Sequence, residues 1–176
     1  MGNTLEAIAK RSSTRGYTPE ALTEEQLKQI ITAGLQAPTA ANRQEVHFTV
    51  VKGDHPLLAE LEEEKNRLRD GGDAPHNFYY EAPVVILLSA DSSNHWGSLD
   101  AGIAVENMSL AAQELGLGSL IIGCIYDALR GEKREYFEKG FGFPEGWQYE
   151  IALAVGYKAT EKEPHTYDEQ ALVNCL

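Results

Sequence analysis

Cysteine is scarce in this 176-residue chain, which contains only Cys124 and Cys175. The two lie far apart and neither belongs to a CxxC pair, so the sequence predicts neither a disulfide framework nor a zinc site. Cys124 follows an apolar run and is expected to be a small apolar filler. The five histidines have no metal-site spacing, and no P-loop or serine-hydrolase motif occurs. We therefore expect no catalytic nucleophile, no metal and a reducing environment.

Positive charge and long hydrophobic runs are also limited. Fifteen Lys and Arg face 27 Asp and Glu, which gives a net charge of −12. Such a chain is repelled by nucleic acid and by anionic membranes, so neither partner is expected. The apolar run at 84–88 falls far short of the ~20 residues that span a bilayer, and the polar beginning has no signal-peptide core. The expectation is a cytoplasmic protein.

The remaining composition is that of an ordinary globular protein, with 43% hydrophobic and 24% charged residues. A chain of this length buries roughly 70% of its extended surface, which suffices for a substantial core. No linker or internal repeat is visible, so residues 1–176 are expected to form a single domain. Helices and strands alternate along it, which favours an α/β or α+β fold.

Hydrophobic periodicity predicts the elements, together with capping and turn residues. Helices are expected over 4–11, from Thr23 to before Pro38, and over 56–69, 102–115 and 127–139. Strands are expected over 46–52, 84–88, 119–124 and 149–157, with a loop at 70–73. The helix at 102–115 is apolar all round, so it must be enclosed by a large core or by another subunit. Asp100 is expected to cap a helix.

Two glycines, Gly116 and Gly118, resemble part of a dinucleotide fingerprint. That fingerprint places its glycines after a strand and before a helix, whereas here a predicted helix precedes them and a strand follows. We therefore expect a helix C-cap and a tight turn.

A basic island lies near the beginning of the chain. Residues 1–19 contain Lys10, Arg11 and Arg15 against Glu6 alone, while residues 70–129 contain eight acids and no Lys or Arg. In the run 11–15, two guanidiniums flank three hydroxyls, a composition suited to a phosphate. The alternative interpretation is a helix C-terminus whose cations offset the helix dipole.

A second candidate segment covers residues 37–44. Its small residues would let a backbone approach a flat ligand, and the amides of Asn42 and Gln44 could pair with a ring edge. The alternative is a plain helix-to-strand loop stopped by Pro38.

Taken together, these segments resemble the nitroreductase-like flavoprotein family. The resemblance is carried by Arg-Ser-Ser-Thr-Arg at 11–15, Ala-Pro-Thr-Ala-Ala-Asn-Arg-Gln at 37–44, Tyr-Glu-Ala-Pro-Val-Val at 80–85, the segment 100–123 and Ala-Val-Gly-Tyr at 154–157. Their order and spacing match over nearly the whole chain. The resemblance implies an α+β fold with a central mixed sheet flanked by helices. It also implies an intertwined homodimer whose C-terminal extension crosses to the partner.

The resemblance further implies non-covalent FMN, with NADH or NADPH as reductant and a small-molecule electron acceptor. The phosphate-binding element corresponds to Arg11, Ser12, Ser13 and Arg15. The loop laid by one subunit against the other's flavin corresponds to Pro38, Thr39, Ala40, Asn42 and Gln44. The strand beside the hydride-accepting nitrogen corresponds to Ile121, Ile122 and Gly123. The cofactor itself carries the hydride chemistry, so no catalytic side chain is required.

This sequence departs from the family's pattern at three places. The chain is short, and the stretch 67–80 with His76, Phe78 and Tyr79 offers only a modest cover, so we expect a site that is open or shaped by His95 and Trp96. Glu45-Val46 stands where members often have Pro-Trp, and the tail offers only Lys162 or His165 where members often supply another cation to the phosphate. The function expected is an FMN-dependent NAD(P)H oxidoreductase of the nitroreductase or quinone-reductase type, working by a ping-pong cycle. The alternatives are a specialised relative with another substrate, a flavin-storage or redox-sensing protein, and a structural domain without flavin.

Overall fold

The computed structural model describes residues 4–69, 76–163 and 166–175. The described helices are α1 (Thr4–Lys10), α2 (Glu24–Leu35), the short 3-10 helix η1 (Ala40–Asn42), α3 (Pro56–Leu68), α4 (Gly97–Glu114), α5 (Tyr126–Arg130), α6 (Arg134–Phe141) and α7 (Glu169–Leu172). The strands are β1 (Val46–Lys52), β2 (Val84–Asp91), β3 (Gly118–Ile122) and β4 (Trp147–Gly156). The expected loop at 70–73 lies outside the described residues.

The four strands form one sheet in the order β1-β2-β4-β3, and every neighbouring pair is antiparallel. The expectation of a mixed sheet is therefore wrong for these strands. After β1 the chain returns to the same end of the sheet before β2 begins. There Gly53 N–H, just after β1, donates to Pro83 O, just before β2, over 2.8 Å. Strand β2 therefore runs antiparallel to β1. Among the described residues, parallel pairing is confined to an isolated bridge between Ser13 and Ser119.

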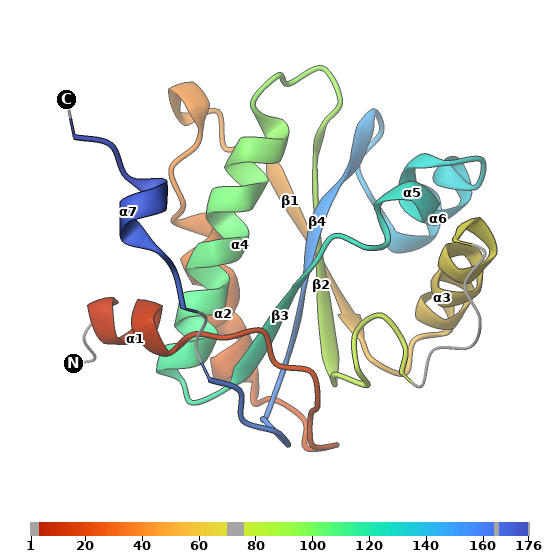
Figure 1. The fold of residues 1–176 in the computed structure, drawn as a ribbon. Helices are drawn as coiled ribbons and strands as arrows, with labels where there is room; N and C mark the ends of the chain where they lie inside the picture. The colour runs from red at the N-terminus through yellow and green to blue at the C-terminus, as the bar shows by residue number, and fades with distance from the viewer. Residues whose placement is uncertain (1–3, 70–75, 164–165, 176) are drawn as a thin grey trace.

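Helices cover both faces of the sheet (Figure 1), α2 and α4 on one and α3, α5 and α6 on the other. Strand β2 contributes to the core on both faces of the sheet. Val85 and Leu87 pack on the side of α3, α5 and α6, and Ile86 and Leu88 pack on the side of α2 and α4. Each of these side chains is fully buried, which stabilises the fold by roughly 1.5–3 kcal/mol apiece. The unbroken apolar run thus has the two-sided burial expected of it.

Helix α4 is packed tightly between the sheet and α2. A Cβ at Gly34 of α2 would lie 2.8 Å from both Met108 Sδ and Phe48 Cε1, so only glycine fits at this crossing. The helix ends as predicted, with Gly116 at φ 75° and the Leu117 N–H bonded to Ala112 O over 2.9 Å.

Two helix predictions need comment. The N-terminus of α2 is confirmed, since Thr23 and Gln26 form a reciprocal capping box. The single helix expected over 127–139 is wrong, because Gly131 adopts an extended conformation (φ −89°, ψ −153°) that separates α5 from α6.

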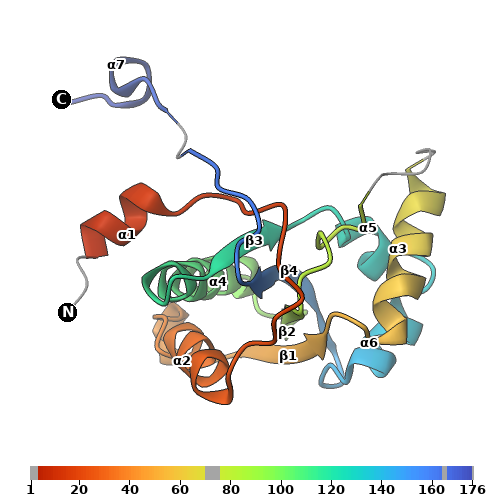
Figure 2. The same ribbon diagram turned by 90° about the horizontal axis from the view of Figure 1, so that it is seen from below.

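The C-terminal segment leaves the domain after β4. Its first residues pair with the segment that follows α1, where Ala159 N–H donates to Gly16 O over 2.9 Å. Beyond it, α7 stands away from the sheet and its helices (Figure 2). Leu172 and Val173 are exposed by 75% and 54%, so this segment adds nothing to the core of its own chain, as expected.

No helix in the described ranges is long and apolar enough to cross a membrane.

Candidate flavin site

The segment from Arg11 to Arg15 is held against the beginning of β3. Thr14 is buried and its N–H donates to Ser119 O over 2.9 Å. A Cβ at Gly118 would lie only 2.6 Å from Thr14 Oγ1, so this glycine permits the close approach. Successive side chains of an extended backbone point to opposite sides. Since the Thr14 side chain is buried, the side chains of Ser13 and Arg15 point to the opposite side.

The two arginines of this segment have different neighbours. Arg11 approaches the middle of α4, where its Nε lies 3.7 Å from Glu106 Oε1. Burial raises the pKa of the Glu106 carboxyl, while Arg11 lowers it. The Arg15 guanidinium lies 6.0 Å from the centroid of the Tyr80 ring. The two guanidinium groups of the segment are therefore separate cations and do not form a single bidentate binding site.

A cavity of about 340 Å³ lies beside the C-terminal end of β3. It brings together four of the predicted residues, namely Arg15, Ile121, Ile122 and Gly123. A Cβ at Gly123 would have its nearest neighbour, Ile151 Cδ1, 4.0 Å away, so the space before this backbone is open. The other lining residues are Lys65, Arg69, His76, Asn77, Phe78, Tyr80, Leu120 and Cys124.

The floor of this cavity is anchored from below by Tyr149. Its hydroxyl donates to Ile122 O over 2.6 Å, and burial raises the pKa of the phenol well above its ordinary value. The hydroxyl therefore stays protonated as a donor and fixes the backbone just before Gly123.

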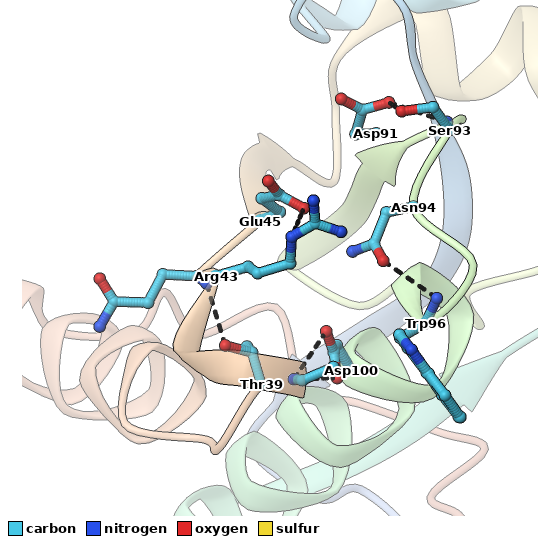
Figure 3. A network of polar contacts seen from close by, with 10 residues as sticks. Thr39, Arg43, Glu45, Asp91, Ser93, Asn94, Trp96 and Asp100 are labelled. Atoms are coloured by element: carbon cyan, nitrogen blue, oxygen red, sulfur yellow. Dashed lines mark hydrogen bonds and ion pairs between the residues drawn. The ribbon is translucent and has the colours of Figure 1, made fainter.

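The predicted loop at 38–44 lies elsewhere, at the first turn of α4 (Figure 3). Thr39 Oγ1 accepts the Gln44 N–H over 2.9 Å, and the Asp100 carboxylate accepts the Ala40 N–H over 3.1 Å. Asp100 was predicted to cap a helix, but it is not the N-cap of α4, because α4 begins at Gly97 and Asp100 lies inside its first turn. It caps a backbone N–H of η1 instead.

Backbone strain is concentrated in these two places. The non-glycine residues with positive φ in the described ranges are Ala41, Asn42, Gln44, Tyr80 and Glu81, at 52° to 57°. Three belong to the 38–44 loop, and the other two adjoin the cavity. Such conformations are costly and tend to cluster at functional sites.

One chain does not assemble all the predicted residues. Arg15 and 121–123 line the cavity, Arg11 contacts the middle of α4, and the 38–44 loop sits at the N-terminal end of α4. Ser12 and Ser13 are half-buried and do not line the cavity. Of the tail candidates, Lys162 is exposed and His165 lies outside the described residues.

Comparisons with known proteins identify the family of the chain. The model of a family described as the nitroreductase family matches residues 8–157. The chain belongs to the nitroreductase family. The match includes every residue assigned to the site above.

Solved members of the nitroreductase family share the whole fold. A nitroreductase from Desulfitobacterium hafniense, solved with bound FMN, is 30% identical, aligns over 100% of both chains and has a TM-score of 0.88. Another from Bacteroides fragilis, also with FMN, is 27% identical over 100% of both chains, with the same TM-score of 0.88. An Archaeoglobus fulgidus protein described as an NADH dehydrogenase/NAD(P)H nitroreductase is 30% identical over 97% of this chain and 94% of its own length.

The cavity fits the cofactor of these nitroreductases. An isoalloxazine ring needs an apolar floor, which Leu120–Ile122 provide, and open backbone beside the ring, which Gly123 provides. It also needs a cation or donor near its polar edge, and Arg15 lies at the cavity wall. In the described residues, no group of His, Cys, Asp and Glu is arranged to hold a metal ion.

Sequence reasoning missed several residues of this site. Lys65 was not assigned to it, and neither was Tyr149, which holds the floor. The segment 80–85 carried the family resemblance, but a positive φ at Tyr80 leaves no mark in the sequence. Asp100 gave a polar signal, and only the tertiary contact with Ala40, 60 residues away, shows its role.

Proposed function

We propose that this protein is an FMN-dependent NAD(P)H oxidoreductase of the nitroreductase or quinone-reductase type. The observation that carries the proposal is the cavity in which Arg15 meets the apolar end of β3 and the open backbone of Gly123. Bound FMN would supply hydride transfer in a ping-pong cycle: a nicotinamide donates a hydride, leaves, and is replaced by the acceptor. The balanced reaction with a quinone converts NAD(P)H, a proton and the quinone into NAD(P)⁺ and the hydroquinone.

In this scheme the side chains and backbone of the protein bind the flavin and fix its orientation. The backbone at Ile121–Gly123 would hold the flavin ring, and Arg15 would supply positive charge to its polar edge. Arg11, Ser12 and Ser13 take the phosphate, whose charge of nearly −2 requires a local cation in a chain of net charge −12. Glu106 holds the Arg11 guanidinium in place without burying it completely, since 18% of that side chain is exposed.

We also propose that the working form is a homodimer. The 38–44 loop cannot reach the cavity of its own chain while it is bonded to the first turn of α4, so the proposal assigns it to the partner's flavin. Trp96 and Leu99 near the start of α4 are exposed by 49% and 56%, and the apolar residues of α7 are exposed as well. A partner would bury these surfaces. We place the dimer in the cytoplasm, with neither nucleic acid nor membrane as a partner.

The test is a double substitution, R11A/R15A, in the purified full-length chain. Each guanidinium that binds FMN contributes roughly 1.5–3 kcal/mol, so the variant should lose its flavin on dialysis. The charge-matched double variant K52A/K139A should keep it, because both lysines lie outside the site. Visible absorption at the flavin band measures both. A flavin-loaded R11A/R15A variant would contradict the proposal.

The storage or sensing alternative keeps the same site without turnover. Anaerobic addition of NADH or NADPH separates the two functions. Bleaching of the flavin band followed by its return on addition of a quinone is expected of the oxidoreductase. A band that neither nucleotide bleaches would favour storage.

A further inference from the structure

The cavity beside β3 is strongly cationic in an acidic protein. Its basic lining residues in the described ranges are Arg15, Lys65, Arg69 and His76, and no carboxylate side chain lines it there. The whole chain has a net charge of −12. A concave site with fixed positive charge attracts anions, and low-dielectric walls strengthen that attraction.

Most of these cations already have partners. Lys65 Nζ lies 2.6 Å from Glu62 Oε1, and His76 Nδ1 lies 3.2 Å from Glu81 Oε2. Arg15 lies against the Tyr80 ring and, under the proposed function, serves the flavin. These three groups therefore leave little uncompensated charge for a further ligand.

Arg69 differs from them. In the part of the chain that the structure describes, no ion pair or side-chain hydrogen bond engages its guanidinium. The nearby Glu62 is occupied, because its carboxylate accepts from Lys65, from Asn66 Nδ2 and from the Phe78 N–H. Arg69 follows the last residue of α3 and lines the cavity with its side chain exposed.

From this arrangement we infer that Arg69 binds an anionic group on the substrate that enters the cavity. The inference rests on the proposed function and names the substrate class: a planar molecule that bears a carboxylate or a phosphate. A guanidinium binds either group through two parallel hydrogen bonds. The flavin phosphate is not the anion meant here, since it is assigned to Arg11 and its serines.

Calorimetry with benzoate and benzamide tests the inference. The two probes are nearly the same size and differ in charge. In R69Q, benzoate affinity should fall about 10-fold or more while benzamide affinity stays unchanged, since one charge-assisted contact is lost. The control K139Q removes an exposed cation on α6 and should change neither affinity. Each titration is run on the FMN-loaded and on the flavin-free protein.

The half-reactions identify which substrate carries the anion. If the nicotinamide does, R69Q should slow flavin reduction by NADPH about 10-fold more than reduction by NADH. If the acceptor carries the anion, R69Q should slow flavin reoxidation by 4-nitrobenzoate more than reoxidation by 4-nitrobenzamide. Either result supports the inference.

Other outcomes overturn it. Equal changes for benzoate and benzamide, or no change for either, would show that Arg69 recognises no anion. Loss of FMN from R69Q would assign Arg69 to the cofactor instead. A wild-type protein that holds no FMN would refute the proposed function, and the benzoate titration of the flavin-free protein would still decide the role of Arg69.

Discussion

Glu64 is a buried carboxylate whose charge is stabilised by two cations. Only 1% of its side chain is exposed, and its oxygens lie 2.6 Å from Arg67 and 2.9 Å from Lys133. The hydrogen bonds from Arg67 and Lys133 lower the pKa of Glu64 from 4.5 to about 2. The pair with Lys133 ties α3 to the segment between α5 and α6, so the contact belongs to the layer that also carries the cavity wall.

This pKa predicts how stability depends on pH. Because the folded pKa lies below the ordinary value, the stabilisation is complete above pH 4.5 and is lost as the pH falls towards 2. Both cations are about half exposed, so solvent screening limits the effect to about 1–2 kcal/mol. E64Q should be less stable than wild type by that amount at pH 7, and the difference should shrink between pH 4.5 and 2.

Urea unfolding across this pH range measures the effect, with E20Q as an exposed control. An E64Q variant whose stability falls with acid as steeply as that of the wild type would refute this role.

At the scale of the element, the 38–44 loop is the least predictable part of the site. In the sequence, Pro38 and the side-chain amides of Asn42 and Gln44 indicated this loop. The prediction that α2 ends before Pro38 is confirmed. Its conformation, with positive φ at Ala41, Asn42 and Gln44, could not be predicted, because it is accompanied by a tertiary contact that the sequence does not reveal. Asp100 supplies this contact from α4. Regular elements were easier to predict, and β1 begins and ends where predicted.

The Asp100 contact can be tested directly. D100A leaves the Ala40 N–H without its acceptor and should destabilise the loop by about 1–3 kcal/mol. Amide hydrogen exchange over residues 37–45 should therefore become faster, while exchange over β2 stays unchanged. S93A is a matched control, because it removes a nearby hydroxyl bonded to Asp91 (Figure 3). Equal exchange in D100A and wild type would exclude Asp100 as the support of the loop.

At the scale of the whole molecule, one chain holds the predicted site residues at three separate places: the cavity, the middle of α4 and the first turn of α4. The sequence could indicate the fold and most of the site through the family resemblance, but it could not place Arg11 and Arg15 against different neighbours. That separation depends on tertiary packing. The exposed apolar residues of α4 and α7 are the part of the structure that a second copy would complete.

Removal of the tail tests this account of the dimer. A chain ending at residue 160 keeps every strand and the pairing of Ala159 with Gly16, so it should still fold. It should be monomeric by light scattering and should bind FMN more weakly, because the partner's loop is lost. Removal of only the last two residues should change neither property. A truncated chain that remains dimeric with full FMN affinity would show that the tail is not part of the dimer interface.

The most direct test of the central claim is the visible absorption spectrum of the purified protein after addition of FMN and dialysis. The expected result is a retained flavin band at one FMN per chain, because in the proposed homodimer a partner's loop would complete each cavity. A colourless protein would contradict it, and would show that the family fold is present here without the cofactor site.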